Sequence, residues 1–201
     1  MRIVTDEKDR QAYKEFLEKH ERCNFQQSPE WAKVKENWIN EIVLAEDESG
    51  KIIGAVSILI RKIPIFGNIM YSSRGPTCDI HDISVMKQLT DGIKELAKKY
   101  KAIVYKAEPD ILSSDEEYRK IVTSLGYKIK DDVYDFRGVS GVVDENHPQY
   151  GLYRFKKGFG ATFTEFVGEV YIPFKPFTYS LYKFSEKAFR NLRGLKTKFK
   201  K

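Results

Sequence analysis

The chain is poor in the features that mark disulfide frameworks, membrane spans and secretion signals. It has 201 residues and two cysteines, Cys23 and Cys78, which are too few for a disulfide framework and are typical of thiols in a reducing compartment. No apolar run approaches the roughly 20 residues that cross a bilayer, and the charged first residues lack a signal-peptide apolar stretch. We therefore expect a cytoplasmic protein, with peripheral contact to the inner face of the plasma membrane as an option.

The usual motifs of metal, nucleophile and nucleotide chemistry are also missing from the sequence. His20, His81 and His147 do not have metal-ligand spacing. There is no nucleophile elbow, no Ser-His-Asp or Cys-His arrangement and no Walker loop. We expect neither a metal nor a bound cofactor.

The composition is that of a folded, basic protein. Hydrophobic residues make up 41% of the chain and aromatic residues 13%, which is enough to build a packed core. The net charge is +6 and the pI is about 9.1, so an anionic partner is expected. Much of the excess charge lies at the end of the chain, over residues 190–201.

Periodicity and capping residues predict alternating helices and strands. Predicted helices cover 6–22, 28–37, 82–100, 114–125, 148–157 and 176–195, and predicted strands cover 41–46, 51–62, 66–73, 101–106, 133–136 and 165–172. Two helices, a three-strand meander, then helix, strand, helix and strand is the order of the Gcn5-related acetyltransferase (GNAT) fold. The predicted fold class is therefore α/β, a GNAT-like mixed sheet flanked by helices.

Four motifs together resemble the FemABX family. They are Ser28-Pro-Glu-Trp-Ala-Lys-Val-Lys35, Tyr71-Ser-Ser-Arg-Gly-Pro76, Tyr134-Asp-Phe-Arg-Gly138 and the stretch Tyr150-Gly-Leu-Tyr-Arg-Phe-Lys-Lys-Gly-Phe-Gly160. Members of this family are aminoacyltransferases that build the interpeptide bridge of peptidoglycan. The resemblance implies a peptidoglycan precursor, lipid II or UDP-MurNAc-pentapeptide, as acceptor and aminoacyl-tRNA as co-substrate. It requires no cofactor.

The resemblance also implies a domain organisation. The family is built from two GNAT-like lobes, and residues 1–128 resemble nearly the whole first lobe. Residues 132–185 resemble the last part of the second lobe, and 186–201 form a basic C-terminal helix or tail. Half a lobe cannot bury its own apolar face, so we expect one hybrid domain in which strands 133–136 and 165–172 join the sheet of the 41–73 meander.

Five residues fall on positions to which the resemblance gives a role. Lys35 matches a lysine on the precursor's diphosphate, and Lys156, after a packed aromatic at Phe155, matches a lysine beside the reacting carbonyl. Glu108 stands where relatives carry Asp-Pro, as a proton acceptor for the attacking amine or as a cap. Arg74 either contacts phosphate or holds its turn. We expect Lys35, Glu108 and Lys156 to face one shared cleft.

Two other readings stay open from the sequence. A CoA-dependent GNAT enzyme would carry a glycine-rich loop of amides after the meander, but Gly75-Pro-Thr77 follows Arg74. A non-catalytic module for anionic membrane or nucleic acid would use the basic C-terminal helix, where Phe184, Phe189 and Phe199 interleave with cations.

Overall fold

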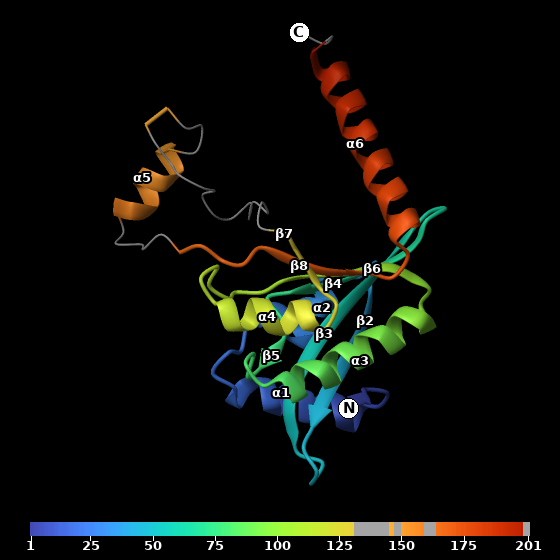
Figure 1. The fold of residues 1–201 in the computed structure, drawn as a ribbon, viewed down its shortest axis with the longest axis vertical. Coiled ribbons are helices and arrows are strands. Elements are labelled where there is room, and N and C mark those ends of the chain that lie inside the picture. The colour runs from blue at the N-terminus through green and yellow to red at the C-terminus, as the bar shows by residue number, and fades with distance from the viewer. Residues whose placement is uncertain (131–144, 147–149, 159–163, 199–201) are drawn as a thin grey trace.

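A computed structural model describes residues 1–130, 145–146, 150–158 and 164–198 (Figure 1). Its centre is one sheet with the strand order β1-β2-β3-β4-β6-β8-β7, and β5 pairs separately with β3. The strands are β1 (Arg2–Ile3), β2 (Ile39–Glu46), β3 (Ile52–Ile63), β4 (Gly67–Ser73), β5 (Thr77–Cys78), β6 (Ala102–Glu108), β7 (Lys128–Lys130) and β8 (Glu169–Pro173). The pair β4–β6 is parallel and the other pairs are antiparallel. The predicted α/β mixed sheet is thus confirmed.

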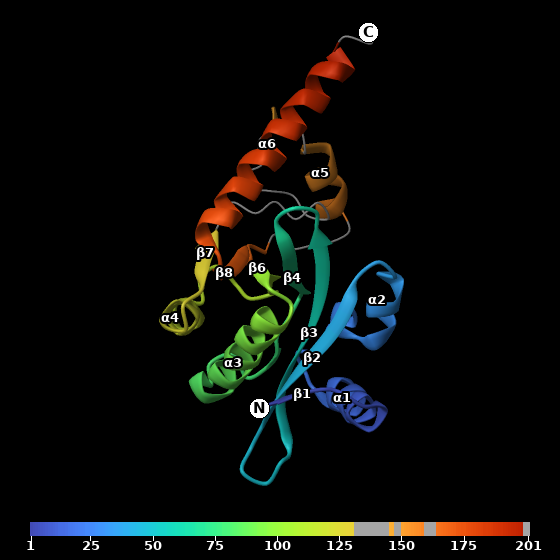
Figure 2. The same ribbon diagram turned by 90° about the vertical axis from the view of Figure 1, so that its right-hand side faces the viewer.

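Helices cover both faces of this sheet (Figure 2). They are α1 (Glu7–Lys19), the 3-10 turn η1 (Phe25–Gln27), α2 (Pro29–Val34), α3 (Ile83–Lys99), α4 (Glu116–Ser124), α5 (Tyr150–Gly158) and α6 (Pro176–Lys198). Helices α3 and α4 lie on one side of the strands, and α1 and α2 lie on the other. The first turns of α6 pack on β6, and the helix then rises away from the sheet.

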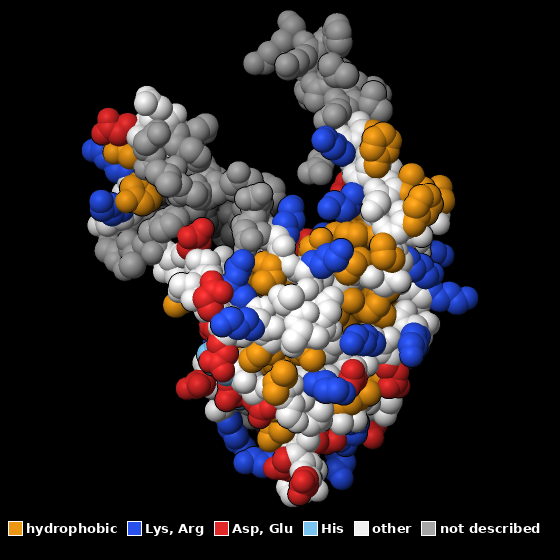
Figure 3. Space-filling view, in the orientation of Figure 1, with side chains coloured by type: hydrophobic (Ala, Val, Ile, Leu, Met, Phe, Trp, Pro, Cys, Tyr) orange, Lys and Arg blue, Asp and Glu red, His pale blue; other side chains and the backbone are white. Residues whose placement is uncertain are grey.

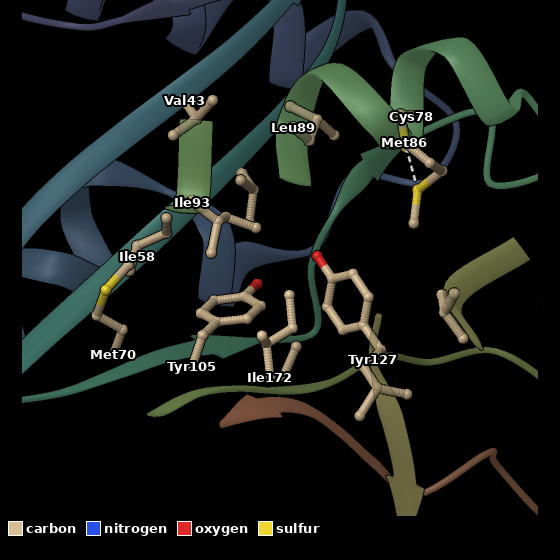
Figure 4. Close-up of a cluster of buried hydrophobic side chains, with 14 of the residues drawn as sticks. Val43, Ile58, Met70, Cys78, Met86, Leu89, Ile93, Tyr105, Tyr127 and Ile172 are labelled. Atoms are coloured by element: carbon tan, nitrogen blue, oxygen red, sulfur yellow. Dashed lines mark hydrogen bonds between the residues drawn. The ribbon is translucent and has the colours of Figure 1, made fainter. Parts of the chain in front are cut away.

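The main core lies between the sheet and α3 (Figure 4). Leu89 and Ile93 on α3 face Val43, Ile58 and Tyr105 of the strands, because positions four apart on a helix share one face. On the opposite side, Tyr13 and Leu17 of α1 form a second buried cluster with β2 and β3.

Capping residues determine where the helices begin. The Asp82 side chain accepts hydrogen bonds from the Ser84 and Val85 amides at the start of α3. Ser28 caps α2 in the same way, followed by Pro29 at the first helical position. Helix α2 ends at Val34, earlier than predicted, because the Trp38 amide donates to the Lys35 carbonyl and turns the chain toward β2.

The C-terminal part of the chain joins the same sheet as the meander. The predicted strand 165–172 occurs as the shorter β8, which pairs with β6, so this part of the one-sheet prediction is confirmed. The edge strand β7, which was not predicted, pairs with β8. The predicted strand 133–136 lies outside the described residues. The division into lobes at 128–132, and into a tail at 186, stays a prediction.

Helix α6 was predicted to end at residue 195, and it continues to Lys198. Within the described part of the chain, we find no helix with the length and apolar character that a bilayer crossing demands.

Candidate active site

Polar side chains gather on one face of the sheet at the ends of β4 and β6. Tyr71 and Ser73 of β4 lie opposite Lys106 and Glu108 of β6. Opposed residues in a sheet point to the same face. On β8, Tyr171 lies opposite Lys106, so Glu169, two positions earlier, shares this face. We call Tyr71, Ser73, Lys106, Glu108 and Glu169 the polar strip.

Glu108 ends β6 and is held by its neighbour on β4. The Tyr71 hydroxyl donates to Glu108 Oε2 at 2.9 Å. Burial raises the pKa of Tyr71 to about 12, and the Glu108 carboxylate adds to that effect. At neutral pH Tyr71 therefore stays protonated and remains a donor to Glu108. Glu108 is half-buried, so its carboxylate is fixed at the strand end without being enclosed.

Lys106 and Glu169 form an ion pair across β6 and β8. Lys106 Nζ lies 3.0 Å from Glu169 Oε2, and the two side chains are 24% and 10% exposed. Lys106 also lies over the Tyr179 ring at the base of α6. Burial alone lowers the pKa of Lys106, but the Glu169 carboxylate and the Tyr179 side chain together outweigh burial, so the pKa lies above its ordinary value. The ion pair therefore holds β8 beside β6, and the contact of Lys106 with Tyr179 holds the base of α6 against the polar strip.

Two glutamines in η1, which the sequence analysis missed, hold the end of β4. The ladder between β3 and β4 stops at Leu59 and Tyr71. Beyond it, Gln27 Nε2 donates to the Ser73 carbonyl at 2.6 Å and its Oε1 accepts from the Ser57 amide at 2.8 Å. The Gln27 amide thus takes the place of the next ladder hydrogen bond.

The neighbouring Gln26 accepts from the Ser73 hydroxyl at 2.9 Å. A Cβ at Gly75 would lie 2.7 Å from the Gln27 side chain, so glycine is needed there. A sequence signal did exist, since Gln26 and Gln27 stand between the capping residues Asn24 and Ser28.

Arg74 leaves β4 with a φ of 56°, in the left-handed region. Its amide donates to the Glu108 carbonyl at 3.2 Å, and its guanidinium lies over the Phe166 ring. These contacts support its role in holding the turn, while phosphate binding stays a prediction. Pro76 has no amide hydrogen, and Thr77 and Cys78 pair with β3. Across residues 74–78, therefore, a cradle of free amides for a CoA pyrophosphate is not formed.

Lys35 is the C-cap of α2, and its Nζ lies over the Trp31 ring at 5.1 Å. Trp31 in turn meets the edge of Phe25, which is 63% exposed. Lys35 is thus a half-buried cation beside an aromatic surface.

The predicted residues on α5 are not brought to the strip by any described contact. The helix stands apart from the sheet in Figure 1, and the Lys156 side chain lies outside the described part. Phe155 is 64% exposed, and its place beside the reacting carbonyl stays a prediction. A shared cleft of Lys35, Glu108 and Lys156 stays a prediction. In the described residues, His, Cys, Asp and Glu do not cluster as a metal site would require.

Comparison with known proteins finds aminoacyltransferases among the relatives of this chain. The chain is 35% identical over 105 residues to UDP-N-acetylmuramoylpentapeptide-lysine N(6)-alanyltransferase of Weissella viridescens, which covers 52% of this chain and 31% of the relative. It is 32% identical over 124 residues to Lipid II:glycine glycyltransferase of Staphylococcus haemolyticus, covering 60% of this chain and 29% of the relative. The chain therefore matches about a third of the length of these relatives.

A crystal structure of FemX shares the fold over 64% of this chain and 32% of its own, with a TM-score of 0.57 and 24% identity. The model of the FemAB family matches two segments, residues 9–129 and 128–187. Because these segments make up most of the sequence, the chain belongs to the FemAB family.

Proposed function

We propose that this chain takes part in transferring an amino acid from aminoacyl-tRNA to the stem-peptide amine of a peptidoglycan precursor, lipid II or UDP-MurNAc-pentapeptide. The observation that carries the proposal is the Glu108 carboxylate, half-buried at the end of β6 and held by Tyr71 at 2.9 Å. The printed activities of the alanyl- and glycyltransferase relatives support the reaction class. The chain spans about a third of the length of these relatives. The two experiments below therefore test whether this chain itself binds the precursor and transfers the amino acid.

Attack on the ester carbonyl requires the acceptor amine in its neutral, unprotonated form. In this proposal Glu108 accepts a proton from the acceptor amine, whose nitrogen forms a bond to the ester carbonyl of the aminoacyl-tRNA. The ester C–O bond then breaks, and the ribose oxygen leaves as a hydroxyl after taking the proton that Glu108 accepted. A donor such as Tyr71 fixes one carboxylate oxygen and orients the other toward the amine. No covalent enzyme intermediate is required.

The remaining predicted residues supply charge. Lys35 would bind the precursor's diphosphate as a point charge. Its contact with the Trp31 ring limits how far the ammonium group moves. Lys156 would stabilise the oxyanion that forms on the ester carbonyl. Arg74, beside the end of β4, is close enough to Tyr71 to lower its pKa and so adds positive charge at this end of the strip.

The first prediction concerns binding of the precursor. In calorimetric titration with UDP-MurNAc-pentapeptide, we expect Lys35→Ala to weaken binding about tenfold, as for one charge-assisted contact. Lys33→Ala is the matched control, an exposed lysine two positions earlier on the same helix, and it should bind like the wild type. Absence of any wild-type binding would rule out precursor recognition by this chain.

The second prediction concerns the transfer rate. With aminoacyl-tRNA and the precursor, we expect Glu108→Gln to reduce kcat about a hundredfold, because an amide cannot accept the proton. Binding of the precursor should be unchanged. Glu36→Gln, an exposed glutamate at the end of α2, is the control and should keep full activity. A Glu108→Gln rate equal to that of the wild type would show that the carboxylate is only structural.

A further inference from the structure

Helix α6 carries exposed apolar side chains on the face that points away from the sheet. Phe177, Leu181 and Phe184 are 83%, 50% and 72% exposed. Their spacing of four and three places them on one face of a helix. In contrast, Tyr179 is buried and Tyr182 is half-buried, and both pack with residues of β4, β6 and the β3–β4 hairpin. The apolar face and the packed face thus lie on opposite sides of α6.

Figure 3 shows hydrophobic side chains gathered along this helix, with Lys and Arg next to them. By sequence, α6 holds six Lys or Arg residues and one Glu, a net charge of +5 out of +6 for the whole chain. Almost all the excess charge of the protein is therefore placed on this one helix.

The β3–β4 hairpin packs against the base of α6 and carries one exposed apolar residue of its own. Ile65 at its tip is fully exposed and has a φ of 73°, a costly conformation for a β-branched residue. Phe66 meets the Tyr182 ring at 5.7 Å, which fixes the hairpin against α6. Lys62 lies exposed at the end of β3, so cations flank the tip as well. We call Phe177, Leu181 and Phe184 the docking face.

We propose that the docking face binds the surface of an anionic lipid bilayer, with α6 lying in the headgroup region. An apolar face on a helix rich in Lys and Arg is the composition of helices that lie in that interface. A second copy of the chain is a poorer occupant, because pairing two α6 helices would bring like charges together. An RNA partner would pair with the cations but would leave the aliphatic side chain of Leu181 without an apolar contact. The inference rests on this surface alone and does not depend on the proposed function.

The test is co-sedimentation of the full chain with vesicles. We expect binding to vesicles of phosphatidylcholine with a quarter phosphatidylglycerol, little binding to phosphatidylcholine alone, and release at about 1 M salt, where screening is nearly complete. Phe177→Ser with Phe184→Ser should weaken binding about tenfold or more, because both side chains lose apolar burial. Circular dichroism should show that the variant stays folded, since both positions are exposed.

Phe189→Ser is the matched control, since Phe189 is a 57% exposed phenylalanine on the same helix but off the apolar face. It should bind vesicles nearly as well as the wild type. The proposal is overturned if the double variant binds anionic vesicles as well as the wild type does. It is also overturned if the wild type binds neutral vesicles as well as anionic ones. If the wild type does not bind vesicles but forms a concentration-dependent dimer, and the double variant does not form that dimer, the docking face binds a second copy of the chain instead. Binding of uncharged tRNA without vesicle binding would assign it to RNA.

Discussion

Replacing Gln27 with leucine is expected to lower the free energy of unfolding by about 2–6 kcal/mol. Gln27 is 1% exposed, and its amide bridges the Ser73 carbonyl and the Ser57 amide where the β3–β4 ladder stops. Leucine has a similar size but cannot bond to either group. Two buried backbone groups would then lose their partners, and each costs about 1–3 kcal/mol. Chemical denaturation followed by circular dichroism measures the difference.

The control for this experiment is Gln11→Leu. Gln11 is exposed on α1 and bonds only to the Glu15 side chain among the described contacts, so its loss should change stability by less than about 0.5 kcal/mol. If Gln27→Leu changed the free energy of unfolding as little, then water or a local shift would have to supply hydrogen bonds to the Ser57 amide and the Ser73 carbonyl. The bridge would then not hold the end of β4.

Replacing Lys106 with methionine is expected to lower the free energy of unfolding by about 3–5 kcal/mol at pH 7. The change leaves the Glu169 carboxylate, only 10% exposed, without the cation that lies 3.0 Å away. Breaking a buried pair on one side is costly because the remaining charge stays desolvated. The double variant Lys106→Met with Glu169→Leu removes both charges, and it should recover most of the lost stability. A double variant no more stable than Lys106→Met would show that packing, not the unpaired charge, causes the loss.

The pH dependence of this pair follows from the raised pKa of Lys106. A lysine whose folded pKa lies above its unfolded value, about 10.4, contributes stability that is fully present below that value. This contribution is lost as the pH rises through the folded pKa. The stability difference between wild type and Lys106→Met should therefore be constant from about pH 6 to 9 and narrow above about pH 10.5. The Lys87–Asp91 pair, exposed on α3, offers a comparison, and Lys87→Met should cost less than about 1 kcal/mol.

Much of the local structure follows from short-range sequence signals. Asp82 and Ser28 stand at the first positions of two predicted helices and cap them, because a capping side chain needs only the amides two or three residues later. The meander strands are apolar runs separated by turn residues, and their predicted bounds lie within two residues of the observed ones. The motifs around Lys35 and Arg74 were sufficient to suggest the family, since they are contiguous in sequence.

The polar strip, in contrast, was only partly visible in the sequence. Glu108 could be chosen from its place before Pro109, but its partner Tyr71 comes from another strand 37 residues earlier. Which side chains share a face depends on the register between β4 and β6, and that register shifts after Asn68. Such a register shift cannot be predicted from a local sequence pattern.

By itself, then, the sequence determined the family, the concentration of positive charge in residues 176–198 and most of the helices and strands, but not the short strands β1, β5 and β7. Tertiary structure alone decided that β8 completes the sheet beside β6. It also decided that Gln27 replaces a ladder bond, and that the apolar face of α6 points away from the core. The physical reason is the range of the interactions. Caps and periodicity act within a few residues, whereas strand order, burial of the Lys106–Glu169 pair and exposure of Phe177 depend on which distant segments meet.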